Sequence, residues 1–430
     1  MEIKEKGEGE EEEGIRIRGF HLLPRIESLT KKYHILREPQ TWRDLCVKFK
    51  KCAEQAESEG APPPIIVICG AKGMGKSTLG RYLLNSLLRS YNQVGYLDTD
   101  MGQPEFTTPG QISLHTLFSP ILGPPFTHQN IPERSIYWGE TSPKDLPDAY
   151  LHGINQLIQH YRKEMALFSH PSKGTQRFTS RGTPLIINAQ GWVRGLGYDL
   201  LMAMLHAVQP THLCHLISSP KGIAQRNNGI ELPPGPWETM TLITVMDDAV
   251  TLPSWARWSS ADRRTLSYLA SMYQSPLNQW TLPIPGSEGI LTAREPWVVP
   301  WSALHIWVSG VEVPTSQLLY ALNASLWTCV GLGLIRGIDP VNHTFHILAP
   351  SLPPSMVRRV RGLVRGPVEG LPWCFGPVRH GRGGCVDAEG RRTPYVSGRG
   401  QEGLGTGVRR VRRNLMRKRL EGHVEGKSGV

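Results

Sequence analysis

The chain has 430 residues, of which 39% are apolar, enough to bury one large core or two modest ones. No run of eighteen apolar residues occurs, and the first residues form an acidic run rather than a signal peptide, so no membrane span or leader is expected. The seven cysteines are scattered and form no C-x-x-C pair, which argues against a disulfide framework and a cysteine-based metal site.

The net charge of +11 is concentrated at one end of the chain. Residues 358–430 hold 17 Lys and Arg against 6 Asp and Glu, whereas the other residues hold 31 of each sign. The basic character therefore describes this end and not the body of the chain. We expect any polynucleotide site in the body to be a local patch rather than a general basic field.

Composition and pattern divide the chain into five parts. Residues 1–14 are rich in Gly and Glu and are predicted to be disordered. Residues 15–60, with a β-like start and a helix-like stretch, are interpreted as the remnant or edge of an N-terminal module. The remaining parts are a phosphate-loop domain over 61–220, a smaller domain over 221–350, and a basic Gly/Arg-rich tail over 351–430 that is predicted to be disordered.

The most specific motif is a phosphate loop. Residues 70–77 read Gly-Ala-Lys-Gly-Met-Gly-Lys-Ser, a complete G-x-x-x-x-G-K-[ST] pattern. In such a loop the backbone N–H groups curve around a polyphosphate, Lys76 neutralises its β and γ oxygens, and Ser77 offers a hydroxyl to Mg²⁺. The alternative is a glycine turn that binds nothing. The predicted nucleotide-binding residues are Gly70, Ala71, Lys72, Gly73, Met74, Gly75, Lys76, Ser77 and Thr78.

The flanking residues support the motif. An apolar run over 65–68 is suited to a buried parallel strand, and leucines recur at helical spacing over 77–91. Strand, loop and helix in this order direct the helix N-terminus at the phosphates.

Strand and helix patterns go on alternating through the phosphate-loop domain. The expected strands are 94–98, 135–138, 185–188 and 212–217, and the expected helices are 146–163 and 198–208. This alternation predicts an α/β fold, a kinase-type parallel sheet with helices on both faces. The smaller domain is expected to be β-rich and to include a helix over 261–273.

A phosphate loop indicates a nucleoside triphosphate but not a reaction. The chain has no base-reading Asn/Thr-Lys-x-Asp segment of a GTPase, and the strand over 185–188 ends in Asn rather than in paired acids. Instead Asp98 and Asp100 follow the strand over 94–98, at the end of the sheet where ligands bind. A carboxylate there can hold a Mg²⁺ water and accept a proton from an attacking hydroxyl. Alternatively, both are loop carboxylates that cap a helix.

At these residues the chain resembles the Clp/Grc family of polynucleotide 5′-hydroxyl kinases, most closely its nucleolar branch. The resemblance covers about residues 65–350. Its motifs are the phosphate loop, Asp100-x-Gly102-Gln103, Thr108-Pro109-Gly110, Leu122-Gly123-Pro124-Pro125-Phe126-Thr127-His128, Asn188-x-x-Gly191-Trp192-Val193, Pro314-x-x-Gln317-Leu318-Leu319 and Gly333-Leu334-Ile335-Arg336-Gly337-Ile338.

The resemblance implies that Mg²⁺-bound ATP gives its γ-phosphoryl group to the 5′-hydroxyl of an RNA or DNA end. Lys76 and Ser77 would serve the phosphates and the metal, and Asp100 would be the metal-linked acid that activates the hydroxyl. Gln103 would help to place the substrate, and Gly191 and Trp192 would form a clasp over it, although Trp192 is also compatible with a core tryptophan.

Kinases of this type also bring an arginine-bearing lid over the γ-phosphate. The candidates are Arg263 and Arg264, which are equally compatible with a solvated helix face. Two departures from the family pattern stand out. Ala189 replaces the threonine of the family's Asn-Thr-x-Gly-Trp clasp, and the large N-terminal module is nearly absent.

The resemblance also carries expectations about the cell. It implies pre-ribosomal RNA processing in the nucleus and nucleolus, an endonuclease partner that makes 5′-hydroxyl ends, and no membrane. The rival interpretation is a catalytically weak scaffold that binds ATP and tethers a processing nuclease. The tail is compatible with an RNA-binding arm and with translated non-coding sequence from an incorrect gene model.

Overall fold

The computed structural model describes residues 16–17, 20–21, 38–59, 61–166, 182–218, 232, 235–244, 259–273, 296–308, 328–350, 352–365, 379–381 and 384–386. The chain divides into two compact units, 1–48 and 49–430. The first holds a short antiparallel hairpin, β1 (Arg16–Ile17) with β2 (Phe20–His21), and the start of helix α1 (Gln40–Glu59). The acidic residues 1–14 lie outside the described residues.

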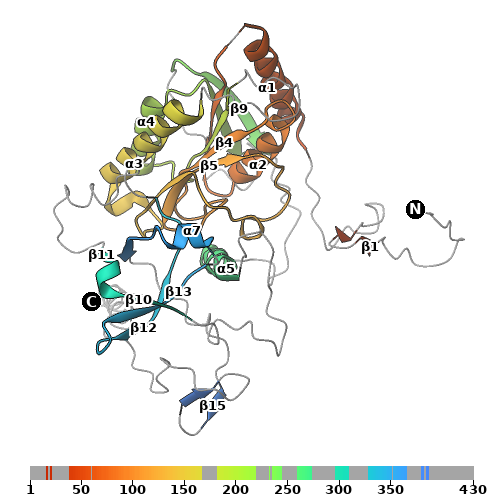
Figure 1. Cartoon of the computed structure of the whole chain (residues 1–430). Coiled ribbons are helices and arrows are strands. Elements are labelled where there is room, and N and C mark those ends of the chain that lie inside the picture. Colours follow the sequence, from red (N-terminus) through yellow and green to blue (C-terminus); the bar gives the residue numbers. More distant parts are fainter. Residues whose placement is uncertain are drawn as a thin grey trace, which may run out of the picture. The chain divides into compact units, whose positions relative to one another are not determined.

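A seven-stranded sheet forms the centre of the second unit (Figure 1). Its order is β6-β5-β4-β7-β3-β8-β9, and the five strands from β4 to β9 in this order run parallel. The strands are β3 (Ile65–Gly70), β4 (Val94–Asp98), β5 (Gln111–Leu117), β6 (Arg134–Tyr137), β7 (Leu185–Asn188), β8 (His212–Ser218) and β9 (Glu238–Thr244).

The sheet differs from the sequence prediction at both edges. β5 and β6 pair antiparallel with their neighbours, because residues 99–110 between β4 and β5 contain no helix that could carry the chain back for a parallel crossover. β5 was not predicted: its sequence Gln-Ile-Ser-Leu-His-Thr-Leu mixes polar and apolar residues although nearly all are buried. β9 pairs with β8, so the sheet continues past residue 220, where the second domain was expected to begin.

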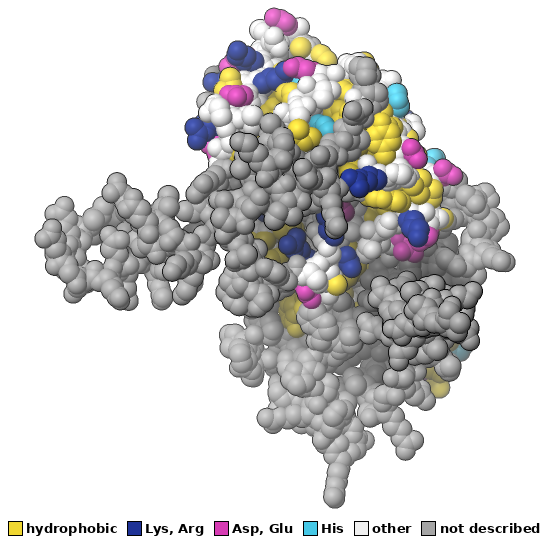
Figure 2. Space-filling view, turned by 180° about the vertical axis from the view of Figure 1, so that it is seen from behind, with side chains coloured by type: hydrophobic (Ala, Val, Ile, Leu, Met, Phe, Trp, Pro, Cys, Tyr) yellow, Lys and Arg dark blue, Asp and Glu magenta, His cyan; other side chains and the backbone are white. Residues whose placement is uncertain are grey.

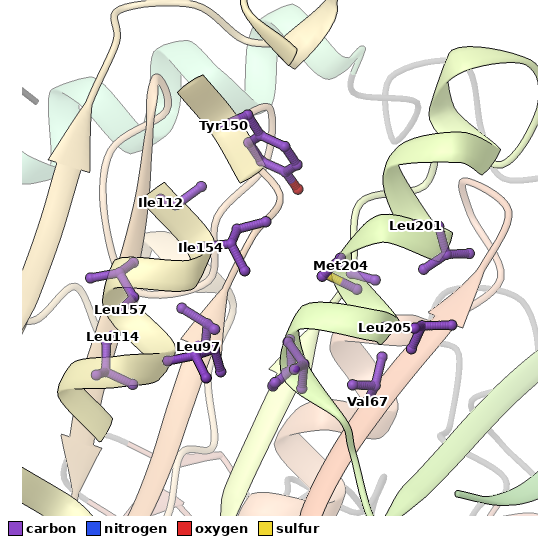
Figure 3. Close-up of a cluster of buried hydrophobic side chains, with 14 of the residues drawn as sticks. Val67, Leu97, Ile112, Leu114, Tyr150, Ile154, Leu157, Leu201, Met204 and Leu205 are labelled. Atoms are coloured by element: carbon purple, nitrogen blue, oxygen red, sulfur yellow. The ribbon is translucent and has the colours of Figure 1, made fainter. Parts of the chain in front are cut away.

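Helices cover both faces of this sheet, as predicted (Figure 1). Helices α3 (Pro147–His160), which continues as a π-helical turn (Tyr161–Met165), and α4 (Leu196–Val208) lie on one face, and α2 (Lys76–Leu87) packs on the other. Between α3, α4 and the sheet lies a buried apolar cluster (Figure 3). Its labelled members are Val67, Leu97, Ile112, Leu114, Tyr150, Ile154, Leu157, Leu201, Met204 and Leu205.

The remaining described residues form smaller elements. Strands β10, β13 and β12 make an antiparallel sheet in that order, and β11 pairs parallel with β14. Among the described residues no helix is long and apolar enough to span a bilayer. The elements are η2 (Pro125–Thr127), η3 (Pro143–Asp145), α5 (Ser260–Tyr273), β10 (Trp297–Pro300), η7 (Trp301–Ala303), β11 (His305–Val308), β12 (Leu334–Asp339), β13 (Thr344–Leu348), α7 (Pro354–Val357), β14 (Gly362–Arg365), β15 (Arg379–Gly381) and β16 (Gly384–Val386).

The second, β-rich part therefore continues into the predicted tail. Helix α7 and strand β14 lie beyond residue 350, and β14 is paired along its whole length with β11. The short apolar stretch Leu363-Val364 supplies strand-forming residues within an otherwise basic region. Of the predicted tail, residues 352–365 and the β15–β16 hairpin lie within the described residues, and the rest lies outside them.

Helix α2 approaches the sheet closely at Gly80. A Cβ atom added there would lie 2.7 Å from the hydroxyl oxygen of Tyr96, a residue with no exposed surface. Within the described ranges the Tyr96 hydroxyl has no hydrogen-bond partner, so a larger side chain at residue 80 is opposed by the clash and not by the loss of a bond.

We expect Gly80→Ala to destabilise the fold by about 1–3 kcal/mol, despite the better helix propensity of alanine. Removing the opposing hydroxyl with Tyr96→Phe should cancel most of that loss, because the two changes act on one contact. Urea unfolding of wild type, both single variants and the double variant measures the coupling. Additive effects of the two substitutions would show that this contact does not limit the packing of α2.

Candidate active site

The phosphate loop joins β3 to α2 in the predicted arrangement. Gly73 and Gly75 have φ angles of 82° and 87°, in the left-handed region that favours glycine. A Cβ atom added at either position would meet nothing within 4 Å, so open space lies beside the loop. The first backbone N–H groups of α2 have no partner within the helix and are available to an anion in this space.

Lys76 is the first residue of α2, and its side chain is buried. Its Nζ donates a hydrogen bond of 3.1 Å to the carbonyl oxygen of Ala71. Burial lowers the pKa of Lys76, and the negative charge of Asp100 is the largest opposing influence. A polyphosphate in the loop would add negative charge and favour the charged ammonium. Ser77 and Thr78 follow in the first turn of α2.

Asp98 ends β4 and is completely buried. Its Oδ1 accepts hydrogen bonds from the N–H of Asp100 (3.1 Å) and from Nδ2 of Asn188 (3.2 Å), and its Oδ2 accepts one from the N–H of Glu105 (2.6 Å). Burial, together with the charge of Asp100, raises the pKa of Asp98 to about 8. Asp98 therefore organises the loop that follows β4, which we call the acid loop (residues 98–108).

Asp100 is partly exposed and lies two residues further along the acid loop. Its Oδ1 accepts hydrogen bonds from the N–H groups of Gly102 (3.0 Å) and Gln103 (3.1 Å), as a loop-capping carboxylate would. Its Oδ2 takes no part in these bonds, and its charge is the one that most raises the pKa of Lys76. Asp100 therefore acts on the charge of Lys76 more strongly than Asp98 does, and its Oδ2 is not used in capping the acid loop.

The predicted clasp also lies against the phosphate loop. A Cβ atom added at Gly191 would lie 2.9 Å from Cα of Lys72 and 3.0 Å from Nζ of Lys76, so only glycine fits this approach. Trp192 is half-buried and packs on α4, where a Cβ atom added at Gly197 would lie 2.5 Å from its Cγ. Ala189 belongs to the buried apolar cluster, and its N–H donates to the carbonyl oxygen of Ile68.

Two amide side chains at this end of the sheet have unpaired atoms. Nε2 of Gln103 and Oδ1 of Asn188 are buried and have no hydrogen-bond partner among the residues that the structure describes. Asn188 was recognised in the sequence only as part of a motif. The sequence signal that could have identified Asn188 is its position at the end of a predicted strand. In the structure β7 and β4 pair in register, so Asn188 lies directly beside Asp98. Buried polar atoms without partners are uncommon and often belong to functional sites.

A cluster of polar side chains around the buried Glu105 supports the acid loop. Oε1 of Glu105 lies 2.9 Å from Nε2 of His128 and 3.4 Å from Nε of Arg81, a residue of α2. This cluster joins the acid loop to α2 and to the 122–128 stretch that carries part of the family resemblance. Glu105, His128 and Arg81 were not predicted, because nothing in the local sequence shows that they meet.

Helix α5, which carries Arg263 and Arg264, begins at the phosphate loop. Nζ of Lys72 donates a hydrogen bond of 2.7 Å to Oγ of Ser260, the first residue of the helix. Arg263 is exposed, whereas Arg264 is half-buried. The charge of Arg264 opposes the effect of burial, which raises the pKa of Tyr268 to about 12. Neither arginine forms an ion pair with another residue in the described part of the chain.

The donor set suits a magnesium nucleotide. Within the described ranges no group of three or more His, Cys, Asp or Glu side chains gathers to hold a metal alone. Mg²⁺ needs few protein ligands when phosphates complete its coordination, and the hydroxyl of Ser77 with the carboxylate of Asp100 is such a minimal set. The residues present therefore fit a metal carried with the nucleotide.

Comparison with known proteins identifies the family of the chain. The family model for the mRNA cleavage and polyadenylation factor CLP1 P-loop matches residues 70–228. The polynucleotide 5′-hydroxyl-kinase NOL9 of Arabidopsis thaliana is 31% identical over 378 residues, which cover 81% of this chain and 95% of that protein. The chain belongs to the NOL9/GRC3 family of polynucleotide 5′-hydroxyl-kinases.

Other members of this family are longer. The NOL9 kinase of Bos taurus is 31% identical over 395 residues, covering 78% of this chain and 53% of that protein. The GRC3 kinase of Cryptococcus neoformans is 30% identical over 422 residues, covering 83% of this chain and 56% of that protein. The chain thus spans about half the length of several curated relatives and nearly all of the plant one.

A solved structure supports the fold. The structure of a wild-type Clp1p–Pcf11p complex superposes with a TM-score of 0.50 at 16% identity, covering 76% of this chain and 79% of that one. At this identity the likeness shows the shared fold of the family alone.

The raised pKa of Asp98 predicts a pH dependence of stability. Because the folded carboxyl holds its proton up to about pH 8 while an unfolded one, with its ordinary pKa of 3.8, loses the proton near pH 4, the folded state loses stability as pH rises through this window. We expect the unfolding free energy of Asp98→Asn minus that of wild type to increase from pH 5 to 8, by at most about 1.4 kcal/mol per pH unit.

Urea unfolding at several pH values measures this difference. Asp148→Asn, at an exposed position in the first turn of α3, is the matched control. A constant difference for Asp98→Asn between pH 5 and 8 would contradict the raised pKa.

Proposed function

We propose that this chain is an ATP-dependent polynucleotide 5′-hydroxyl kinase, which transfers the γ-phosphoryl group of ATP to the 5′-hydroxyl of an RNA end and also accepts DNA. The observation that carries the proposal is the convergence of three segments. Lys76 in the phosphate loop, Asp100 in the acid loop and Gly191 in the clasp meet at the carboxyl end of one parallel sheet. Ligands bind at this end of open α/β sheets.

The proposed roles follow from position. Residues Gly70–Thr78 cradle the phosphates, with Lys76 at the transferring group, and Ser77 and Asp100 would hold Mg²⁺. The metal ion, when bound, neutralises charge on the phosphate oxygens. Asp100 also accepts the proton of the attacking 5′-hydroxyl through Oδ2, the oxygen that takes no part in capping the acid loop. Its capping bonds hold that oxygen in place.

The polynucleotide end is proposed to lie between the acid loop and the clasp. Gln103 has a buried, unpaired amide nitrogen that can donate to the substrate, and Gly191 and Trp192 form the opposite wall. On the face seen in Figure 2, basic and acidic side chains alternate over the described residues. The described residues visible on this face form no broad basic track, which supports recognition of the polynucleotide end by local contacts.

Arg264 is proposed as the lid arginine in preference to Arg263. Both lie within one turn of Ser260, whose Oγ contacts Lys72 of the phosphate loop. The two arginines differ in burial. Arg264 is half-buried beside Tyr268, on the packed face of α5, whereas Arg263 is exposed. An arginine held near the transferring group would stabilise its developing negative charge.

The setting of the activity is proposed from the family. Membership in the NOL9/GRC3 family supports a role in pre-ribosomal RNA processing in the nucleolus. An endonuclease that leaves 5′-hydroxyl ends would be the natural partner, because its product is the substrate of this kinase.

Phosphoryl transfer to a 5′-hydroxyl oligonucleotide tests the proposal. With γ-³²P-labelled ATP, wild type should label the oligonucleotide and Lys76→Ala should not. Asp100→Asn should keep its ATP affinity and lower transfer by about 10²-fold or more, since it removes the proton acceptor. ATP binding is followed separately by a fluorescent analogue.

Two outcomes would contradict these roles. ATP binding without any transfer by wild type would favour the ATP-binding scaffold. Greater loss of transfer in folded Asp98→Asn than in Asp100→Asn would show that the catalytic acid is the other carboxylate.

The lid assignment makes a separate prediction. Arg264→Met should lower kcat by about 10³-fold, because an arginine at the transferring phosphoryl group raises kcat by a factor of about 10³–10⁵ in related reactions. Arg263→Met, one residue away and solvent-exposed, should change kcat less than about tenfold. Steady-state kinetics of the two variants side by side decide the assignment, and the reverse order of effects would assign the role to Arg263.

A further inference from the structure

Helix α5 is attached to the rest of the site by a buried contact that lies away from its arginines. Nε2 of Gln129 donates hydrogen bonds to the carbonyl oxygen (2.8 Å) and to Oγ (2.7 Å) of Ser267. Gln129 is only 6% exposed and Ser267 only 8%. Oγ of Ser267 in turn donates to the carbonyl oxygen of Thr107 (3.4 Å), a residue of the acid loop.

The same contact is tied to the acid loop by a second route. Gln129 follows His128, whose Nε2 lies 2.9 Å from Oε1 of the buried Glu105. The N–H of Glu105 donates to Oδ2 of Asp98, the carboxylate that organises the acid loop. Ser267 is therefore joined to the segment that carries Asp100 both directly, through Thr107, and through Gln129, His128 and Glu105.

A second hydrogen bond from α5, to the phosphate loop, is of a different kind. Lys72 and Ser260 meet in an exposed hydrogen bond, which exchanges with water at little cost. Gln129 and Ser267 are buried, so that breaking their contact leaves polar groups unpaired inside the protein. The position of the helix is therefore determined at Ser267, one turn after Arg264.

We propose that Gln129 and Ser267 form a positioning pair that fixes helix α5 to the acid loop and so holds Arg264 at the transferring phosphoryl group. The expected effect on catalysis rests on the proposed kinase function, whereas the attachment of helix α5 rests on the hydrogen bonds given above. Neither residue touches the reacting atoms. The pair acts by setting the distance between the lid arginine and Asp100.

Gln129→Met tests the pair, because methionine has a similar length but no donor. We expect the amides of α5 to exchange with solvent about tenfold faster or more, as for a segment that has lost a buried anchor. We expect kcat to fall about ten- to hundredfold, while the Kd for ATP changes less than about threefold, since the phosphate loop is untouched.

A series of substitutions separates an effect on the position of helix α5 from a general effect on packing. Ser267→Ala should have a smaller effect than Gln129→Met, because the carbonyl oxygen of residue 267 still accepts one bond. Ser267→Thr, which keeps the hydroxyl, should restore both exchange and kcat to within about threefold of wild type. Gln159→Met on the exposed surface of α3 makes the same chemical change elsewhere and serves as the control.

Hydrogen exchange and kinetics together give distinguishable outcomes. Faster exchange confined to α5 supports the pair even if wild type transfers no phosphoryl group, in which case only the kinase proposal fails. Unchanged exchange in α5 of Gln129→Met overturns the pair, and so does an equal loss of protection in α5, α4 and β3. If Gln129→Met does not fold, the same comparison is made with Ser267→Ala.

Discussion

The site depends on one buried carboxylate, Asp98. A buried polar group is tolerated only where hydrogen bonds replace its water, and Asp98 receives three, from the backbone of Asp100 and Glu105 and from the side chain of Asn188. These bonds shape the acid loop and connect it to the neighbouring strand β7. Two acids so near in sequence therefore have different surroundings, since Asp98 is completely buried and Asp100 is partly exposed.

Strand register extends this constraint across the sheet. Ile68, Asn188 and Asp98 lie side by side in β3, β7 and β4. Asn188 and Asp98 end their strands, and β3 ends two residues further on at Gly70, so the phosphate loop, the clasp and the acid loop all follow the same end of the sheet. Gly191 then permits a backbone approach to Lys72 and Lys76 that any side chain would prevent. Convergence of the three segments is thus a consequence of parallel pairing.

Local patterns made much of this predictable. The phosphate loop is a contiguous motif, and the apolar strands before Asp98 and Asn188 are short and continuous, so the sequence identified them and the structure confirms the α/β fold. Contacts between distant residues were not predictable: Lys72 and Ser260 are 188 positions apart, and Gln129 and Ser267 are 138 apart. Strand β5 was missed because buried Gln, Ser and His residues interrupt its apolar pattern.

The substitution at Ala189 changes how the clasp has to work. This side chain is 1% exposed and packs within the apolar cluster, so it contributes to the core and not to the open space beside the phosphate loop. Whatever a threonine hydroxyl offers in relatives, the contacts of this clasp with the phosphate loop come from the backbone around Gly191, which lies against Lys72 and Lys76. A clasp built from backbone can still approach a transferring phosphoryl group, because its position is fixed by the bond from the N–H of Ala189 to Ile68 and not by the missing hydroxyl. The clasp without the threonine hydroxyl is therefore compatible with the proposed transfer, in which Asp100 and Arg264 have the proposed catalytic roles.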